Sequence, residues 1–160
     1  MFHILDIDNT LFFTNELNNK AYIFALSSLG LKPLSPCKRI TRTVIASWYP
    51  FLKDEEMIAI IRLKQIYVGE NLYLISINDD LHQLLRKVGP NMVGLWTAAD
   101  PIRIKKILDY NDITNYTYIR FSDKSQDDIC HGIQEFCHVF HCEKNQLCFY
   151  EAVSYTHLRA

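Results

Sequence analysis

The sequence predicts an α/β fold in which a doubly wound parallel sheet carries a small inserted helical segment. Two observations predict it. Short apolar runs alternate with segments whose apolar residues recur every three or four positions, which is the pattern of alternating strands and helices. The chain of 160 residues also has the size of one domain with a small insertion. Together these features indicate a Rossmann-like architecture.

The first part of the chain contains one strand followed by helices. The strand is predicted over Phe2–Leu5, an apolar run that stops at Asp6. The periodicity of the apolar residues then predicts three helices: Glu16–Leu29, Ile40–Trp48 and Asp54–Val68. Gly30 suits the end of the first helix, and three acidic residues at the start of the third suit a helix N-terminus.

After residue 78 the chain alternates between helix and strand. The predicted elements are, in order, Leu81–Val88, Met92–Trp96, Ile102–Tyr110, Tyr116–Phe121, Ser125–Val139 and Leu147–Tyr150. Asp6, Thr97 and Lys124 all fall just after predicted strands. Ligands of open parallel sheets bind beyond the carboxyl ends of the strands, so we expect these three residues along one edge of the sheet.

Composition excludes several classes of function. The net charge is −1, from 17 basic and 18 acidic residues, and gives no reason to expect nucleic acid or an anionic membrane as a partner. The five glycines form neither a P-loop nor a dinucleotide-binding fingerprint. The N-terminus lacks the basic region of a signal peptide, and no apolar stretch is long enough to span a bilayer. The chain has five cysteines, an odd number that cannot all pair in disulfides within one chain. We therefore expect a cytoplasmic protein with reduced thiols.

The stretch from Asp6 to Thr10 carries the chemistry. It reads Asp-Ile-Asp-Asn-Thr and places two carboxylates, Asp6 and Asp8, two positions apart directly after a strand. One carboxylate can attack phosphorus and form an aspartyl-phosphate, and the other can protonate the leaving oxygen and later activate water. Repulsion between the two carboxylates favours a bound cation, and Mg²⁺ prefers such oxygen ligands.

These residues resemble the motifs of the haloacid dehalogenase-like phosphatase superfamily. Its first motif, a strand followed by D-x-D-x-T, stands complete at Asp6–Thr10. The second motif is a strand that ends in Ser or Thr, and it matches Thr97. The third motif is a lysine near the start of a helix, and it matches Lys124. The fourth motif is an acidic pair after a strand, and it falls on Glu151. The resemblance implies a core over residues 1–14 and 79–151, with a helical cap over 15–78.

The resemblance also implies roles for individual residues. Asp6 is the expected nucleophile and Asp8 the expected general acid and base, whereas Thr97 and Lys124 would bind the phosphoryl group. A Mg²⁺ ion would be held by Asp6, Asp8 and Glu151. The expected substrate-binding residues are Thr10, Phe12, Asn15 and Ala98. The expected activity is Mg²⁺-dependent hydrolysis of a small phosphorylated metabolite or nucleotide through an aspartyl-phosphate.

The sequence departs from the family pattern at three places, one of which is Phe13, where many members have aspartate. Asn9 stands where many members have glycine, and Ala152 stands where the fourth motif should supply a second acidic residue. We interpret residues 152–160 as a non-native tail, because the string resembles translated adapter sequence, and we expect a core that lacks its C-terminal part. If Ala152 is native, the alternative function is a catalytically impaired binding protein with this fold.

The lysines and the cysteines each allow a second interpretation. Lys105 and Lys106 compete with Lys124 for the third motif, but they lie inside a predicted helix and are expected to face solvent. Cys137 and Cys142, with His138 and His141 between them, suggest zinc. Their spacing crosses one helix end and does not form the two separated ligand pairs of a structural zinc site, which favours a simple helix terminus.

Overall fold

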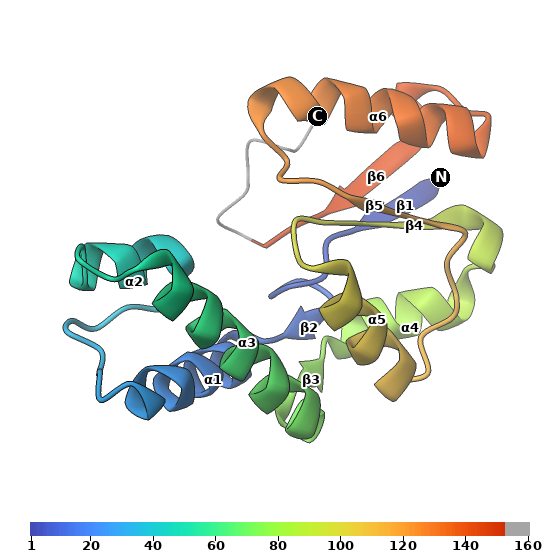
Figure 1. Ribbon diagram of the computed structural model, residues 1–160. Coiled ribbons are helices and arrows are strands. Elements are labelled where there is room, and N and C mark those ends of the chain that lie inside the picture. Colours follow the sequence, from blue (N-terminus) through green and yellow to red (C-terminus); the bar gives the residue numbers. More distant parts are fainter. Residues whose placement is uncertain (153–160) are drawn as a thin grey trace. The chain divides into compact units, whose positions relative to one another are not determined.

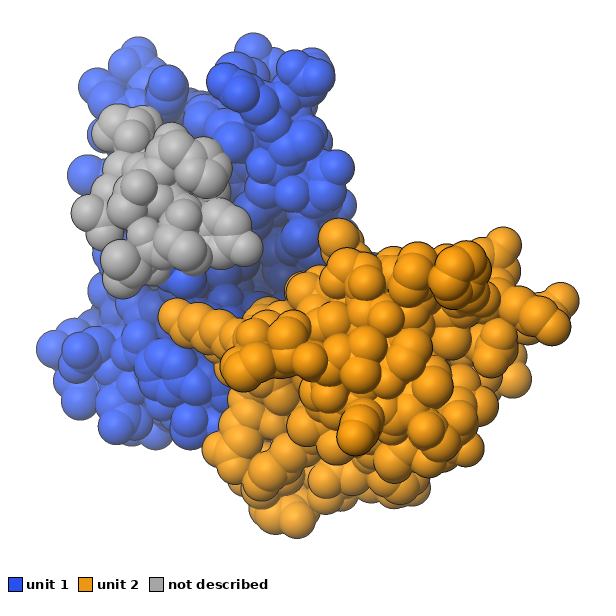
Figure 2. Space-filling model, turned by 90° about the vertical axis from the view of Figure 1, so that its left-hand side faces the viewer, with its two compact units in different colours: residues 1–13, 76–160 blue, residues 14–75 orange. Residues whose placement is uncertain are grey.

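The computed structural model describes residues 1–152 and divides the chain into two compact units (Figures 1 and 2). The first unit contains residues 1–13 and the chain from residue 76 onward, and the second contains residues 14–75. The sequence predicts an inserted segment over residues 15–78, which ends three residues later than the second unit of the structure. Apart from Ala152, the segment that we interpret as a foreign tail lies outside the described residues.

The first unit is built on a parallel sheet whose described strands run in the order β5-β4-β1-β6. The strands are β1 (Phe2–Leu5), β4 (Val93–Thr97), β5 (Tyr118–Phe121) and β6 (Leu147–Tyr150). Strand β1 pairs with β4 on one side and with β6 on the other, so the chain reverses its direction of travel across the sheet at β1. In doubly wound sheets such a reversal opens the crevice in which ligands bind.

Helices cover both faces of this sheet (Figure 1). They are α4 (Asp79–Lys87), α5 (Pro101–Tyr110) and α6 (Gln126–Phe140), with α6 on one face and the other two on the opposite face. Trp96 and Phe136 are buried together between β4 and α6. Helix α6 approaches the sheet closely at Gly132, where an added Cβ would lie 2.3 Å from Cη2 of Trp96. Close packing between α6 and β4 therefore depends on this glycine.

A short antiparallel ladder lies within the first unit, where the chain leaves it after residue 13 and returns at residue 76. Strand β2 (Phe12–Phe13) pairs with β3 (Ser76–Ile77), in a register that places Phe12 opposite Ile77. Asn78 supports the ladder by donating from Nδ2 to the carbonyl of Thr10, at 3.1 Å. The sequence did not predict these strands, because two residues are too few to show an alternating pattern.

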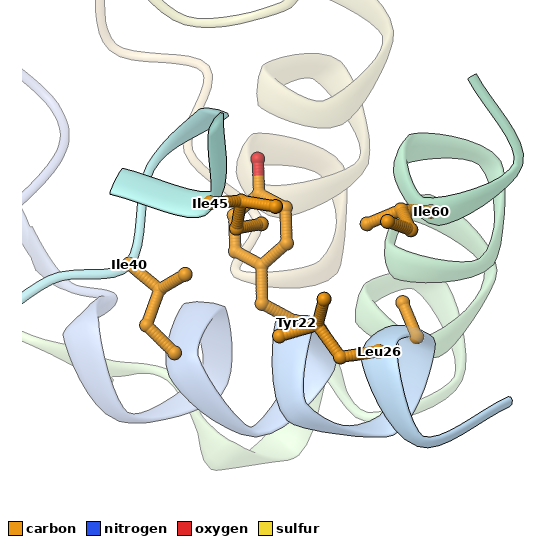
Figure 3. Close-up of a cluster of buried hydrophobic side chains, with 6 residues drawn as sticks. Tyr22, Leu26, Ile40, Ile45 and Ile60 are labelled. Atoms are coloured by element: carbon orange, nitrogen blue, oxygen red, sulfur yellow. The ribbon is translucent and has the colours of Figure 1, made fainter. Parts of the chain in front are cut away.

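The second unit consists of three α-helices packed around their own core. They are α1 (Asn15–Ser28), α2 (Arg42–Trp48) and α3 (Asp54–Glu70). Tyr22 and Leu26 of α1 point toward Ile45 of α2 and Ile60 of α3 (Figure 3). The second helix starts two residues later than the periodicity predicts, because the hydroxyl of Thr41 caps it by accepting from the Val44 backbone N–H at 3.2 Å.

Short 3-10 turns complete the described chain: Leu72–Leu74, Pro90–Met92 and Lys144–Gln146. Two strands begin later than the sequence predicts. Strand β4 begins one residue after Met92, which belongs to a 3-10 turn, and β5 begins two residues after Tyr116. Within residues 1–152, no helix is both long and apolar enough to cross a membrane.

Candidate active site

Four predicted residues lie at the carboxyl ends of the parallel strands. Asp6 follows β1, Thr97 ends β4, Lys124 follows β5 and Glu151 follows β6. Because the strands are parallel and adjacent, this topology brings the four residues to one edge of the sheet, around the reversal at β1. The structure also places the side chains of Asp6, Lys124 and Glu151 in direct contact.

Lys124 bridges two carboxylates. Its Nζ lies 2.7 Å from Oδ1 of Asp6 and 2.7 Å from Oε1 of Glu151. The three side chains are exposed by only 10%, 8% and 9%, respectively, so water screens these ion pairs weakly. Lys124 has a left-handed backbone (φ 54°), and the next residue, Ser125, caps α6. This turn starts the helix while directing the lysine along the edge of the sheet, with Nζ 5.8 Å from the centre of a Trp96 ring.

Asp6 lies in a tight loop that folds back on the end of β1. Its second carboxylate oxygen, Oδ2, accepts a hydrogen bond from the hydroxyl of Thr10 at 3.0 Å. The loop turns at Asn9, whose φ of 60° lies in the left-handed region. Asparagine adopts this conformation more readily than most residues, which explains how it can occupy a position where glycine is common in the family. Burial raises the pKa of Asp6, and the nearby Lys124 and Thr10 oppose this effect.

Glu151 carries a buried carboxyl group whose pKa is raised. Burial, followed by the nearby charge of Asp6, raises the pKa of Glu151 to about 7, although Lys124 acts in the opposite direction. Its Oε2 atom is buried and has no hydrogen-bond partner among the described residues. A buried oxygen of this kind, beside a second carboxylate, fits the oxygen-ligand chemistry of Mg²⁺.

Asp8 forms an ion pair with Arg103, a residue outside the predicted catalytic set. Both of its carboxylate oxygens accept from the Arg103 guanidinium, Oδ1 at 3.0 Å and Oδ2 at 2.6 Å. The arginine lies in the first turn of α5, six residues after Thr97. Such two-point pairing fixes the orientation of a carboxylate as well as its charge.

Thr97 is buried at the end of β4. Its Oγ1 accepts from the backbone N–H of Ala99 at 3.1 Å, and its carbonyl accepts from the backbone N–H of Ser122 at 3.0 Å. The second contact ties the end of β4 to the loop that leads to Lys124. Ala98, the next residue, is exposed just beyond the strand.

Solved structures share this fold, although no protein-family model and no curated protein matches the chain. A predicted phosphoglycolate phosphatase from Haemophilus somnus superimposes with a TM-score of 0.75 at 15% identity, over 92% of this chain and 75% of that one. A haloacid dehalogenase-superfamily hydrolase of subfamily IA from Geobacter sulfurreducens gives a TM-score of 0.68 at 15% identity, over 92% and 75%. CbbY from Rhodobacter sphaeroides, in complex with xylulose 1,5-bisphosphate, gives 0.64 at 12% identity, over 93% and 77%. The chain has the haloacid dehalogenase-like fold.

Within this haloacid dehalogenase-like fold, one expected substrate-binding residue is placed differently. Phe12 is fully buried (0% exposed) in β2, and its role toward a substrate remains a prediction. Its neighbour Phe13 is 49% exposed and lines a cavity of about 460 Å³ together with Thr10, Asn78 and Glu151. The alternation of side chains along a strand accounts for the difference between the two phenylalanines.

Asn15 lies in the second unit, at the start of α1. Its Oδ1 accepts from Nη1 of Arg39 at 2.8 Å, and the same nitrogen donates to the hydroxyl of Thr14 at 3.2 Å. Asn15 therefore has a polar partner within its own unit, and its role toward a substrate remains a prediction.

The rival lysines and the cysteine-rich helix end lie outside this candidate site. Lys105 is 77% exposed and pairs with Asp109 at 2.9 Å on the surface of α5, and Lys106 is exposed. Among residues 1–152, no group of three histidine, cysteine or acidic side chains is arranged to hold a metal ion. The cysteines and histidines near residue 140 surround the end of α6, where His141 adopts a left-handed backbone.

The sequence-based reasoning missed Arg103. Its position in the first turn of the helix that follows Thr97 was a usable signal, because that turn begins at the same edge of the sheet as the motif residues. The nearby Lys105 and Lys106 made it look like one more surface charge of an amphipathic helix. Only the structure shows that its side chain is 11% exposed and turned to Asp8, 95 positions away in the sequence.

Proposed function

We propose that the protein is a Mg²⁺-dependent phosphomonoester hydrolase that acts through an aspartyl-phosphate on a small phosphorylated metabolite or nucleotide. The observation that carries the proposal is the bridge from Lys124 to Asp6 and Glu151 at the carboxyl ends of β5, β1 and β6. A buried cation between two carboxylates suits the transfer of a dianionic phosphoryl group, since catalysis of that reaction depends mainly on positioning and on neutralising charge.

The residues divide the reaction into two steps. In the first step, a carboxylate oxygen of Asp6 forms a bond to phosphorus while the ester oxygen leaves and takes a proton from Asp8. In the second step, Asp8 removes a proton from water, the water oxygen attacks phosphorus, and the bond to Asp6 breaks to release phosphate. Lys124 and the hydroxyl of Thr97 would bind the phosphoryl oxygens through both steps.

The residues that would hold Mg²⁺ are Asp6, Asp8 through its backbone carbonyl, and Glu151. The buried Oε2 of Glu151, without a hydrogen-bond partner among the described residues, supports this assignment. When bound, the ion would add positive charge that stabilises the phosphoryl oxygens.

A second candidate function applies if Ala152 is native and does not belong to the foreign tail. The fourth motif of the family places an acidic residue there, and this chain has a methyl group, which cannot bind a cation. Weak retention of Mg²⁺ would leave a protein that binds phosphorylated ligands through Lys124 and hydrolyses them slowly.

One experiment separates the two candidates. Hydrolysis of 4-nitrophenyl phosphate is measured with Mg²⁺ and with excess EDTA, for the wild type and for Asp6→Asn. We expect hydrolysis that needs Mg²⁺ and is lost in Asp6→Asn. Phosphate binding without hydrolysis, detected as an increase in melting temperature, would favour the binding protein, and Mg²⁺-dependent hydrolysis that survives Asp6→Asn would overturn the mechanism.

A further inference from the structure

Arg103 is a charged side chain beside Asp8 that the proposed reaction does not yet use. Its guanidinium donates from Nη1 to Oδ1 and from Nη2 to Oδ2 of Asp8, and the two side chains are exposed by only 11% and 20%. The other cations of α5 lie on its surface: Lys105 pairs with a neighbour on its own helix, and Lys106 is exposed. Arg103 is therefore distinguished from its helical neighbours by both its burial and its partner.

The base of Arg103 is held rigidly. The side chain of Asp100 caps α5 by accepting from the Arg103 backbone N–H at 2.9 Å, and Pro101 occupies the first position of the helix. The next residue, Ile104, is fully buried and anchors the same turn in the core. A planar guanidinium that projects from such a fixed turn can hold a carboxylate in one orientation.

We infer that Arg103 is a positioning residue that orients the carboxyl group of Asp8 for proton transfer to the leaving oxygen. A carboxylate offers about four acceptor sites, so the two donors of Arg103 do not exhaust them. In the first step the proton passes from Asp8 to the ester oxygen, and in the second step Asp8 regains a proton from water, while Arg103 keeps all of its protons. This inference rests on the proposed phosphatase function and adds a residue to it.

The test exploits leaving groups of different quality. The 4-nitrophenolate ion leaves phosphorus with little protonation, whereas phenolate is a poorer leaving group and depends more on the proton from Asp8. We expect Arg103→Gln to lower kcat/KM for phenyl phosphate by roughly tenfold more than for 4-nitrophenyl phosphate, since general acid catalysis contributes about 10²- to 10⁴-fold. Arg103→Lys, which keeps the charge but not the two-point geometry, should recover part of the loss.

Two further variants distinguish positioning from a structural role. If Arg103 acts through Asp8, adding Arg103→Gln to Asp8→Asn should change kcat/KM by less than about twofold, because partners in one unit are not additive. Lys105→Gln, on the same helix but in an exposed ion pair, is the matched control and should leave kcat/KM unchanged for both substrates.

The possible outcomes separate the inference from the proposed function. Equal losses for both substrates, or losses from the Arg103 and Asp8 variants that multiply, would overturn the positioning role while leaving the phosphatase intact. A wild type that hydrolyses neither substrate would overturn the proposed function and this inference with it. If Arg103→Gln melts well below the wild type, the comparison of the two substrates is made with Arg103→Lys. A larger loss of kcat/KM for phenyl phosphate than for 4-nitrophenyl phosphate supports the positioning role, and equal losses overturn it.

Discussion

Lys124 and Asp6 form a buried ion pair between residues 118 positions apart, with Nζ 2.7 Å from Oδ1. The pair connects the turn after β5 to the end of β1, across the intervening strand β4. Glu151 on β6 accepts from the same nitrogen, so one cation joins three segments of the sheet edge. Stability and the proposed catalysis therefore depend on the same side chain.

Removing this cation should harm both properties. Lys124→Met leaves two buried carboxylates facing each other without a counter-charge, and breaking a buried pair in this way costs about 3–5 kcal/mol. Hydrolysis of 4-nitrophenyl phosphate should fall by about 10²- to 10³-fold, as expected for the loss of one group that stabilises transition-state charge. Urea unfolding and initial rates measure the two effects, with Lys105→Met as a surface control. Unchanged rates would show that Lys124 has no role in phosphoryl transfer.

The left-handed turn at Asn9 predicts an unusual order of substitutions. With φ at 60°, the alanine variant should be less stable than the wild type by about 1 kcal/mol, because alanine has the Cβ that crowds the following carbonyl oxygen but lacks the short polar side chain that lets asparagine adopt this conformation. Glycine has no such penalty, so Asn9→Gly should change the free energy of unfolding by less than about 0.5 kcal/mol. Urea unfolding of both variants tests this order, and an Asn9→Gly protein less stable than Asn9→Ala would contradict it.

The close approach of α6 to Trp96 predicts that Gly132→Ala is destabilising, although alanine normally favours a helix. The added Cβ would lie 2.3 Å from Cη2 of a tryptophan that is only 2% exposed. Overpacking of this kind costs about 1–3 kcal/mol, which exceeds the gain of about 1 kcal/mol in helix propensity. Gly89→Ala is the matched control, since nothing lies within 4 Å of its added Cβ. A Gly132→Ala protein as stable as the control would show that the helix can shift outward freely.

His3 predicts a loss of stability in mild acid. Burial, with the nearby positive N-terminus, lowers the pKa of His3 below its usual 6.5, and Nδ1 lies 2.9 Å from the hydroxyl of Tyr150. The folded protein therefore binds this proton less tightly than the unfolded chain does. The stabilising contribution is present above pH 6.5 and is lost as the pH falls below that value.

The melting temperature, measured from pH 7.5 to pH 5, tests this behaviour of His3. The wild type should lose more stability over this range than His3→Gln, which cannot gain a proton at that position. His138→Gln, a substitution outside the His3–Tyr150 contact, is the comparison. Identical pH profiles for the wild type and His3→Gln would contradict the prediction.

Much of the fold could be predicted from the sequence, because strands β1, β4 and β6 are mainly apolar runs that end at or just before a polar residue. Asp6 and Thr97 mark such ends directly, and the parallel pairing that follows brings them to one edge. The three-residue and four-residue periodicity similarly located the main helices. These signals are local, and a sequence displays local patterns well.

The remaining features depend on contacts between distant residues. The partnership of Arg103 with Asp8 requires a particular side-chain orientation in the first turn of α5, which periodicity cannot reveal. The burial of Phe12 follows from a two-residue ladder with β3, more than 60 positions away. Both features are set by partners far away in the sequence, which the local pattern around each residue does not show.

The ladder of β2 and β3 has a consequence for how this chain could change. Phe13 and Ser76 are paired, so residues 14–75 leave the first unit and return to it at neighbouring points. An insert whose two ends are already joined can be lengthened, shortened or exchanged without altering the register of the four parallel strands. The residues of the candidate site at the sheet edge and the helices of residues 14–75 thus lie in separate stretches of the chain.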